Sequence, residues 1–170
     1  MGRMSKIKGA EFERKISHLL LEAAGDEFGP KDCFRTPGSG GHPFMGICDL
    51  MFSEKMAPLF PWCCELKHQA GLKLEQVLDM IVQIREFHEQ VLKGAARDPL
   101  KRPPMVIMRG SGGNIYAMAR QDDLESWSCC SIGQVAGMDY QYDGAWWRLV
   151  KFDELLDVVK VRAAERKTTA

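Results

Sequence analysis

The sequence predicts an α/β fold in which helices lie on the faces of a mixed β-sheet. Amphipathic helical patterns alternate along the chain with short apolar runs that are typical of strands. Their order is helix, strands, helix, strands, helix, which favours a sheet covered by helices. The chain has 170 residues, of which 45% are hydrophobic and 27% charged, so it has the composition and length of one globular domain spanning 1–170.

A first helix is predicted over residues 9–24, after a basic N-terminal arm over residues 1–8. One apolar stripe supports the helix, formed by Phe12, Ile16, Leu19, Leu20 and Ala23. Gly25 stands where helices commonly end. Glu13 falls at the margin of the stripe and Glu11 on the solvent side, so Glu13 is the acid that can point along the sheet. The alternative is that Glu13 is a boundary residue paired with a surface lysine.

Short strands are predicted next over residues 34–36, 47–52 and 62–66. The first strand runs into a loop at residues 37–43, where Gly and Pro exclude regular structure. The other two strands are apolar runs that contain or precede carboxylates, as described below.

The second half of the chain continues the alternation of helices and strands. A long amphipathic helix is predicted over residues 72–92, followed by a connection over 94–104. The remaining predicted elements are a hairpin of strands 105–108 and 115–119, a helical turn at 122–127, a strand at 146–152, a helix at 154–165 capped by Asp153, and a frayed tail at 166–170.

Charge and hydropathy limit the classes of partner. The formal net charge is zero, so a nucleic-acid surface must be a local basic patch. The apolar stretches are too short to cross a bilayer, and no signal-type segment follows the basic N-terminus. We therefore expect an intracellular, cytoplasmic protein with no membrane partner.

The six cysteines do not form a recognisable disulfide framework, because two adjacent pairs and no Cys-x-x-Cys spacing are present. Zinc ligation by Cys63, Cys64, His68 and Cys129 is an alternative, but this set does not match the usual clusters. In a strand, Cys63 and Cys64 also point to opposite faces. Reduced, buried thiols are the expected state.

Asp49 and the segment Glu65-Leu66-Lys67 are the strongest candidates for a functional site. Both carboxylates lie in or beside buried strands, where an ionised group needs a partner because its desolvation costs several kcal/mol. A divalent cation is a common partner for two carboxylates. Glu65 and Lys67 share one face of their strand, which brings an ammonium beside a metal-bound carboxylate and suits hydrolysis of a phosphodiester.

An ordered set of motifs carries a family resemblance. Lys8-Gly9-Ala10-Glu11-Phe12-Glu13-Arg14, Arg35-Thr36-Pro37-Gly38-Ser39, Asp49 and Glu65-Leu66-Lys67 resemble the archaeal-type Holliday junction resolvases of the PD-(D/E)xK nuclease superfamily. The resemblance covers about the first seventy residues. The segment between Gly38 and Asp49 is longer than in compact members, and no motif matches beyond about residue 95.

The resemblance implies a restriction-endonuclease-like core and a set of site residues. The implied metal ligands are Asp49, Glu65, the backbone carbonyl of Leu66, and Glu13. Lys67 would orient or deprotonate the attacking water, and Ser39 would contact the scissile phosphate. The resemblance implies that Arg14 and Arg35 contact the DNA backbone, and the local basic charge of the sequence adds Lys8, His68 and Lys73 as DNA-binding candidates. Mg²⁺ suits these oxygen ligands, with Mn²⁺ as a substitute, and the product would carry a 5′-phosphate.

The implied partner is branched double-stranded DNA, cut by a homodimer without a small-molecule cofactor. The rival functions are another nuclease of the superfamily (nicking, repair, restriction-type or exonuclease), a catalytically silent DNA-binding protein of the same fold, or a zinc protein. Individual residues also have structural alternatives. Lys67 can be a solvent-facing strand end, Ser39 a linker residue, Arg14 a solvated helix residue and His68 a structural residue.

Overall fold

The computed structural model describes residues 3–36, 48–69, 76, 79, 82–110, 113–128 and 136–169. The elements in chain order are α1 (Arg3–Ala24), β1 (Cys33–Arg35), β2 (Leu50–Phe52), β3 (Cys63–His68), α3 (Val82–Arg97), β4 (Pro104–Arg109), β5 (Ile115–Arg120), α4 (Gln121–Ser128), β6 (Gly137–Tyr142), β7 (Ala145–Lys151) and α5 (Phe152–Thr169).

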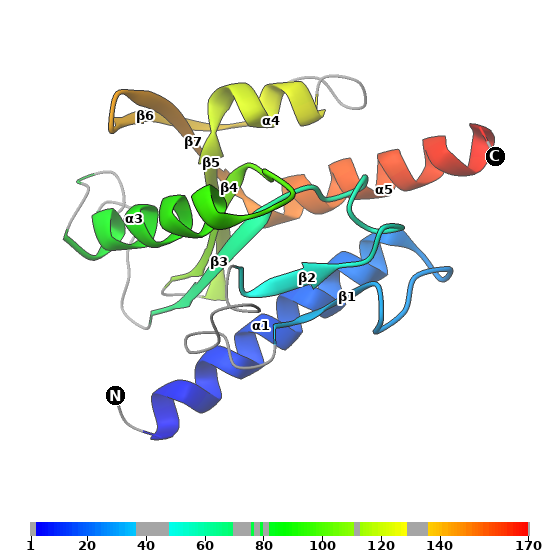
Figure 1. Ribbon diagram of the computed structural model, residues 1–170, viewed down its shortest axis with the longest axis horizontal. Coiled ribbons are helices and arrows are strands. Elements are labelled where there is room, and N and C mark those ends of the chain that lie inside the picture. The colour runs from blue at the N-terminus through cyan, green and yellow to red at the C-terminus, as the bar shows by residue number, and fades with distance from the viewer. Residues whose placement is uncertain are drawn as a thin grey trace.

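The main sheet has five strands in the order β3-β4-β5-β7-β6. β3 and β4 are parallel, whereas the pairs β4–β5, β5–β7 and β7–β6 are antiparallel, so the sheet is mixed as predicted. β1 and β2 form a separate two-stranded antiparallel sheet beside α1 (Figure 1). β3 is therefore an edge of the main sheet, and the chain that carries Asp49 runs alongside this edge.

Two apolar layers enclose the main sheet. On one face, α1, α4 and α5 pack over the sheet through a core that includes Ile16, Trp62 and Phe152. On the other face, α3 packs through Ile84, Phe87 and Val91 against side chains of β4, β5 and β7. Figure 1 shows α1 and α5 running together on one side and α3 on the opposite side. The predicted α/β architecture with helices on both faces of a mixed sheet is confirmed.

Both chain ends differ from the prediction. Residues 3–8 are helical and extend α1, so the predicted arm is wrong for these residues. Their straight-chain Lys and Met side chains favour continuation of a helix. α5 continues to Thr169, although a frayed tail was predicted from residue 166. Arg166 donates to the carbonyl of Lys55 (2.6 Å), and Lys167 pairs with Glu27 (3.0 Å), which ties the last turns to the loops.

Element ends shift in the second half of the chain. α3 runs to Arg97, so residues 94–97 are helical and not part of a connection. Pro99 follows shortly after and disfavours further helix. The predicted helix over 72–92 began ten residues earlier than α3, but within 72–81 the structure describes only residues 76 and 79. α4 is longer than the predicted turn, and α5 begins at Phe152, one residue before the predicted cap.

Strand β6 was not predicted, although the sequence contains a signal for it. Asp143-Gly144 joins β6 to β7, and both residues have positive φ (50° and 73°). An Asp-Gly pair between alternating apolar residues is a strong hairpin signal because it accommodates this backbone. No helix in the described part of the chain is long and apolar enough to span a membrane.

A buried histidine connects α3 to the β6–β7 hairpin. His88 is fully buried; its Nδ1 lies 2.8 Å from the Ile84 carbonyl, and its Nε2 lies 2.9 Å from the Tyr140 hydroxyl. Its ring also contacts Tyr142 and Trp147, with centroids 4.4 and 4.6 Å away. Burial lowers the pKa of His88, so the neutral ring is the form that the fold accommodates.

We predict that this histidine makes the fold acid-sensitive. Because its folded pKa lies below its ordinary value of 6.5, the unfolded chain binds the extra proton first as the pH falls. The contribution of His88 to the free energy of unfolding should therefore decrease as the pH drops below about 6.5. Urea denaturation of the wild type and His88→Gln at pH 7.5 and 5.5 measures this. The pH dependence should shrink in His88→Gln and persist in His18→Gln, which alters an exposed histidine.

Candidate active site

Asp49 lies directly beside the edge strand β3. Its backbone N–H donates to the carbonyl of Cys64 (2.8 Å), and its side-chain Oδ2 accepts from the N–H of Leu66 (2.7 Å). Thr36 at the end of β1 fixes the same segment, because its N–H donates to the Asp49 carbonyl (2.9 Å) and its hydroxyl to the Cys48 carbonyl (2.6 Å). The carboxylate is thus held at the level of Glu65 by the backbone on both sides.

Glu65 and Lys67 project from the same face of β3, as the two-residue period of a strand requires. The Lys67 ammonium lies 2.6 Å from Oε1 of Glu65. Both side chains are about four-fifths buried, with exposed fractions of 21% for Glu65 and 22% for Lys67. The pair is therefore partly shielded from solvent but still open to a ligand.

Two residues of α3 position Lys67, and the sequence did not identify either. The Lys67 ammonium donates to Oε1 of Gln90 and lies 5.4 Å from the centre of the Phe87 ring. An ammonium over an aromatic face is stabilised electrostatically. The contact between β3 and α3 joins segments distant in the chain and carries no local sequence signal. Gln83, on the same helix, accepts a hydrogen bond from Gln69 (2.8 Å).

Glu13 approaches from the opposite face of the sheet. It is 8% exposed on α1, next to Phe12, whose ring packs on His68. Its carboxylate forms an ion pair with Nε of Arg35 at the end of β1, so its partner is an arginine and not a surface lysine. Among the described residues, the oxygens of Glu13, Asp49 and Glu65 do not all lie within 4.8 Å of one another. The charge of Glu65 acts on Asp49 more strongly than the charge of Glu13 does.

The carboxyl group of Asp49 is costly to ionise at this position. Burial is the main cause, and the charges of Glu65 and, less strongly, Glu13 add to it, raising the pKa of Asp49 to about 7. The hydrogen bond from Leu66 and the charge of Lys67 oppose this effect. A bound divalent cation would relieve the repulsion, so the donor set fits a cation that prefers oxygen ligands. The carbonyl of Leu66 lies on the same strand edge as its N–H and is available as a further oxygen.

Basic side chains lie on either side of the acids. Lys8, His68 and Arg109 gather where α1 meets the ends of β3 and β4, and burial together with the nearby charges of Arg109 and Lys8 lowers the pKa of His68. On the other side, Arg14, His18 and Arg35 line a hollow of about 240 Å³ between α1 and β1. Arg109 and His18 were not among the predicted contacts.

Two predicted site residues, Ser39 and Lys73, lie outside the described residues. The same holds for Cys129, which was considered as a zinc ligand. Among the described residues, Cys63, Cys64 and His68 do not bring their ligand atoms close enough to one another to hold a metal ion. Cys64 is a free buried thiol whose pKa burial raises further, and the His68 ring packs on Phe12.

The expectation that all cysteines are reduced is wrong for one pair. Cys48 and Cys63 form a disulfide with a Cα–Cα distance of 5.4 Å. Cys48 immediately precedes Asp49, and Cys63 precedes Glu65 by two positions. Sequence reasoning missed the pair because the two residues approach only when the chain before β2 lies along β3.

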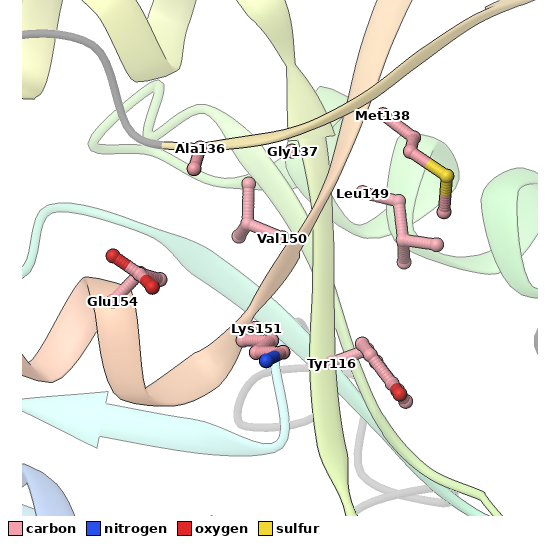
Figure 2. A pocket seen from close by; sticks show the side chains of 8 residues that line it. All are labelled: Tyr116, Ala136, Gly137, Met138, Leu149, Val150, Lys151 and Glu154. Carbon is pink, nitrogen blue, oxygen red and sulfur yellow. The ribbon is translucent and has the colours of Figure 1, made fainter.

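A larger hollow of about 330 Å³ lies elsewhere, between the start of β6, β5, β7 and the first turn of α5. Figure 2 shows its lining, with Val150 and Leu149 on β7, Tyr116 on β5 and Glu154 on α5. The walls are mainly apolar, and none of the carboxylates near β3 reaches it. We therefore assign the candidate chemistry to the β3 edge and not to this hollow.

Comparison with known proteins identifies the family of the chain. The family described as "Phage putative PDDEXK endonuclease" matches residues 4–154, which include Glu13, Asp49, Glu65 and Lys67. Nothing matches among curated proteins or among solved structures. The matched segment covers most of the 170 residues, and the mixed sheet with flanking helices fits a restriction-endonuclease-like core. The chain therefore belongs to the phage PDDEXK endonuclease family of the PD-(D/E)xK nuclease superfamily.

Proposed function

We propose that this endonuclease is a Mg²⁺-dependent enzyme that cuts branched DNA, with four-way junctions as its substrate. The observation that carries the proposal is the arrangement of Asp49 beside β3, next to Glu65 and Lys67 on one strand. Two partly buried carboxylates with an ammonium at 2.6 Å are the groups needed to bind a cation and to act on a phosphodiester. Membership of an endonuclease family supports hydrolysis of nucleic acid.

In this proposal, Asp49, Glu65 and the backbone carbonyl of Leu66 bind the cation. Mg²⁺ fits because it prefers oxygen ligands and keeps several waters, and Mn²⁺ would substitute. The bound ion supplies Lewis acidity and a more acidic water. Glu13 acts from the other face, as an additional acid through water and as the partner that orients Arg35.

Lys67 orients or deprotonates the attacking water, or offsets the charge that develops on the phosphate. Its contacts with Gln90 and Phe87 hold the ammonium from α3, so its position does not depend on Glu65 alone. We propose Gln90 as a positioning residue for this lysine.

The DNA backbone would follow the basic side chains on both sides of the acids. Lys8, His68 and Arg109 offer charge at one side, and Arg14, His18 and Arg35 at the other. Such phosphate contacts position DNA without reading its sequence. Ser39 is proposed for the scissile phosphate and Lys73 for the backbone, on the motif resemblance and the local charge of the sequence.

Junctions are proposed because the motifs before Asp49 resemble those of junction resolvases. Resolution needs two matched incisions, which a twofold homodimer provides. Each incision would leave a 5′-phosphate.

We predict that ionisation of Asp49 destabilises the metal-free protein as the pH rises, in the direction opposite to the effect of His88. The folded pKa of Asp49 is about 7 against an ordinary value of 3.8, so the folded state holds its proton longer between these values. An asparagine at this position cannot ionise, so Asp49→Asn does not lose stability in this way. Its melting temperature should therefore exceed that of the wild type by more at pH 8 than at pH 4. The gap should be a few degrees, at about 2–4 °C per kcal/mol for a chain of this size. Thermal melts in EDTA measure it, and Glu54→Gln, at an exposed acid after β2, should leave it unchanged.

We predict that Asp49→Asn and Lys67→Ala each reduce DNA cleavage in Mg²⁺ by about 100-fold or more, because the first removes a charged cation ligand and the second the ammonium at the reacting phosphate. Single-turnover cleavage rates with both variants measure this. Glu54→Gln is the matched control and should cut like the wild type. Unchanged cleavage by either site variant, or a wild type that cuts in neither Mg²⁺ nor Mn²⁺, would contradict the proposed site and favour a silent DNA-binding protein.

We predict symmetric paired nicks on a four-way junction. The assay compares a junction, a flap, a nicked duplex and a linear duplex of the same sequence, with the strands labelled separately and the 5′ ends tested with phosphatase and kinase. Preference for the junction supports resolution by a homodimer, which light scattering of the protein–junction complex can measure. Equal cutting of linear duplex, or digestion from an end, would assign the chain to another nuclease type of the superfamily.

A further inference from the structure

The chain segments that carry the two proposed metal ligands are covalently joined. The Cys48–Cys63 disulfide links the residue before Asp49 to the first residue of β3, two positions before Glu65. The Cα–Cα distance of 5.4 Å lies within the usual range for disulfides. Both sulfurs are buried, with Cys48 6% and Cys63 1% exposed.

Among the described residues, few hydrogen bonds join these two segments. β2 pairs with β1 and is not a strand of the main sheet, so no continuous ladder joins it to β3. Asp49 is held to β3 by two hydrogen bonds, from its N–H to Cys64 and to its carboxylate from Leu66. These bonds hold the Asp49 carboxylate in a position where the negative charges of Glu65 and Glu13 repel it. The disulfide adds a covalent link between β3 and Cys48, the residue directly before Asp49.

The surroundings favour a disulfide over a metal site at these sulfurs. Cys48, Cys63 and Asp98 have potential ligand atoms within 4.8 Å of one another. The Asp98 carboxylate, however, is paired with Nε of Arg102 (2.6 Å) and accepts from the N–H groups of Leu100 and Arg102. Nη2 of Arg102 lies 3.4 Å from Sγ of Cys48, so a cation there would meet a guanidinium. The charge of Asp98 is therefore already balanced by Arg102, and the two sulfurs bond to each other.

We propose that the Cys48–Cys63 disulfide positions Asp49 beside Glu65 and thereby sets the affinity of the site for its divalent cation. This inference rests on the proposed function, because it takes Asp49 and Glu65 as the ligands. Cys48 and Cys63 are positioning residues, since they act through the carboxylates and touch no substrate. Loss of the bond frees the segment before β2 and weakens cation binding.

The bond makes the site responsive to thiols. A dithiol such as dithiothreitol attacks one sulfur, forms a mixed disulfide and then closes on itself, leaving two cysteine thiols and one cyclic disulfide. Two electrons and two protons pass from the dithiol to the protein. Oxidised glutathione reverses the change and leaves as two glutathione thiols.

The first test counts thiols in the full chain. The protein, purified without reductant, is unfolded and alkylated with iodoacetamide before and after reduction, and its mass is measured. Reduction should add two alkyl groups, and peptide mapping should place both on Cys48 and Cys63. An equal count before and after reduction would overturn the proposal, as would a bound zinc ion found by elemental analysis at these thiols.

The second test measures Mn²⁺ affinity by calorimetry in the absence of DNA. The oxidised protein should bind about 10-fold or more tightly than the same protein after reduction, in the range seen when groups that orient metal ligands are lost. Cys48→Ser/Cys63→Ser should match the reduced protein, and Cys33→Ala, which removes a free buried thiol on β1, should match the wild type. Equal affinity in oxidised and reduced protein would overturn the proposal. Chemical reduction of the wild type gives the answer even if the double variant does not fold.

These measurements separate the two proposals. If Asp49→Asn cuts DNA normally, the proposed site fails whatever the thiol count. If Asp49→Asn abolishes both cleavage and Mn²⁺ binding while reduction leaves affinity unchanged, the nuclease proposal stands and the role of the disulfide fails.

Discussion

The hydrogen bond from the Leu66 N–H to Asp49 is the constraint on which the candidate site depends. It places a carboxylate against the free edge of β3, level with Glu65. Asp49 directly precedes β2, whose small sheet shares no ladder with the main one, so without this bond only one described hydrogen bond, from the Asp49 N–H to Cys64, would hold the residue to β3. The contacts of Thr36 and the Cys48–Cys63 bond reinforce the same placement from both sides. A 15-residue separation between bridged cysteines contributes about 3 kcal/mol in the loop-entropy description.

That placement is electrostatically unfavourable on its own. Burial and the neighbouring Glu65 raise the pKa of Asp49, and Lys67 compensates only in part. Perturbed groups of this kind gather at functional sites because the same arrangement that opposes ionisation favours a bound cation. The fold tolerates the arrangement because the rest of the sheet is a packed apolar core on both faces.

The sequence predicted those features that depend on local patterns. The apolar runs around Asp49 and Glu65 located the strands, and the two-residue period placed Glu65 and Lys67 on one face. What it did not predict depends on contacts between distant segments. Gln90 reaches Lys67, and Cys48 meets Cys63, only after α3 and the chain before β2 pack against β3. The placement of Glu13 on the opposite face, with Arg35, follows from the packing of α1 in the same way.

The contact of His88 with the β6–β7 hairpin has a consequence for residues far from the candidate active site. Helix α3 presents Phe87 and Gln90 to Lys67 and, between them, His88 to the hairpin of β6 and β7. The same helix therefore contacts both the Lys67 amine and the hairpin at the opposite edge of the sheet. In the proposed enzyme, substitution of Tyr140 or Trp147 would therefore alter turnover through α3, without any contact to DNA.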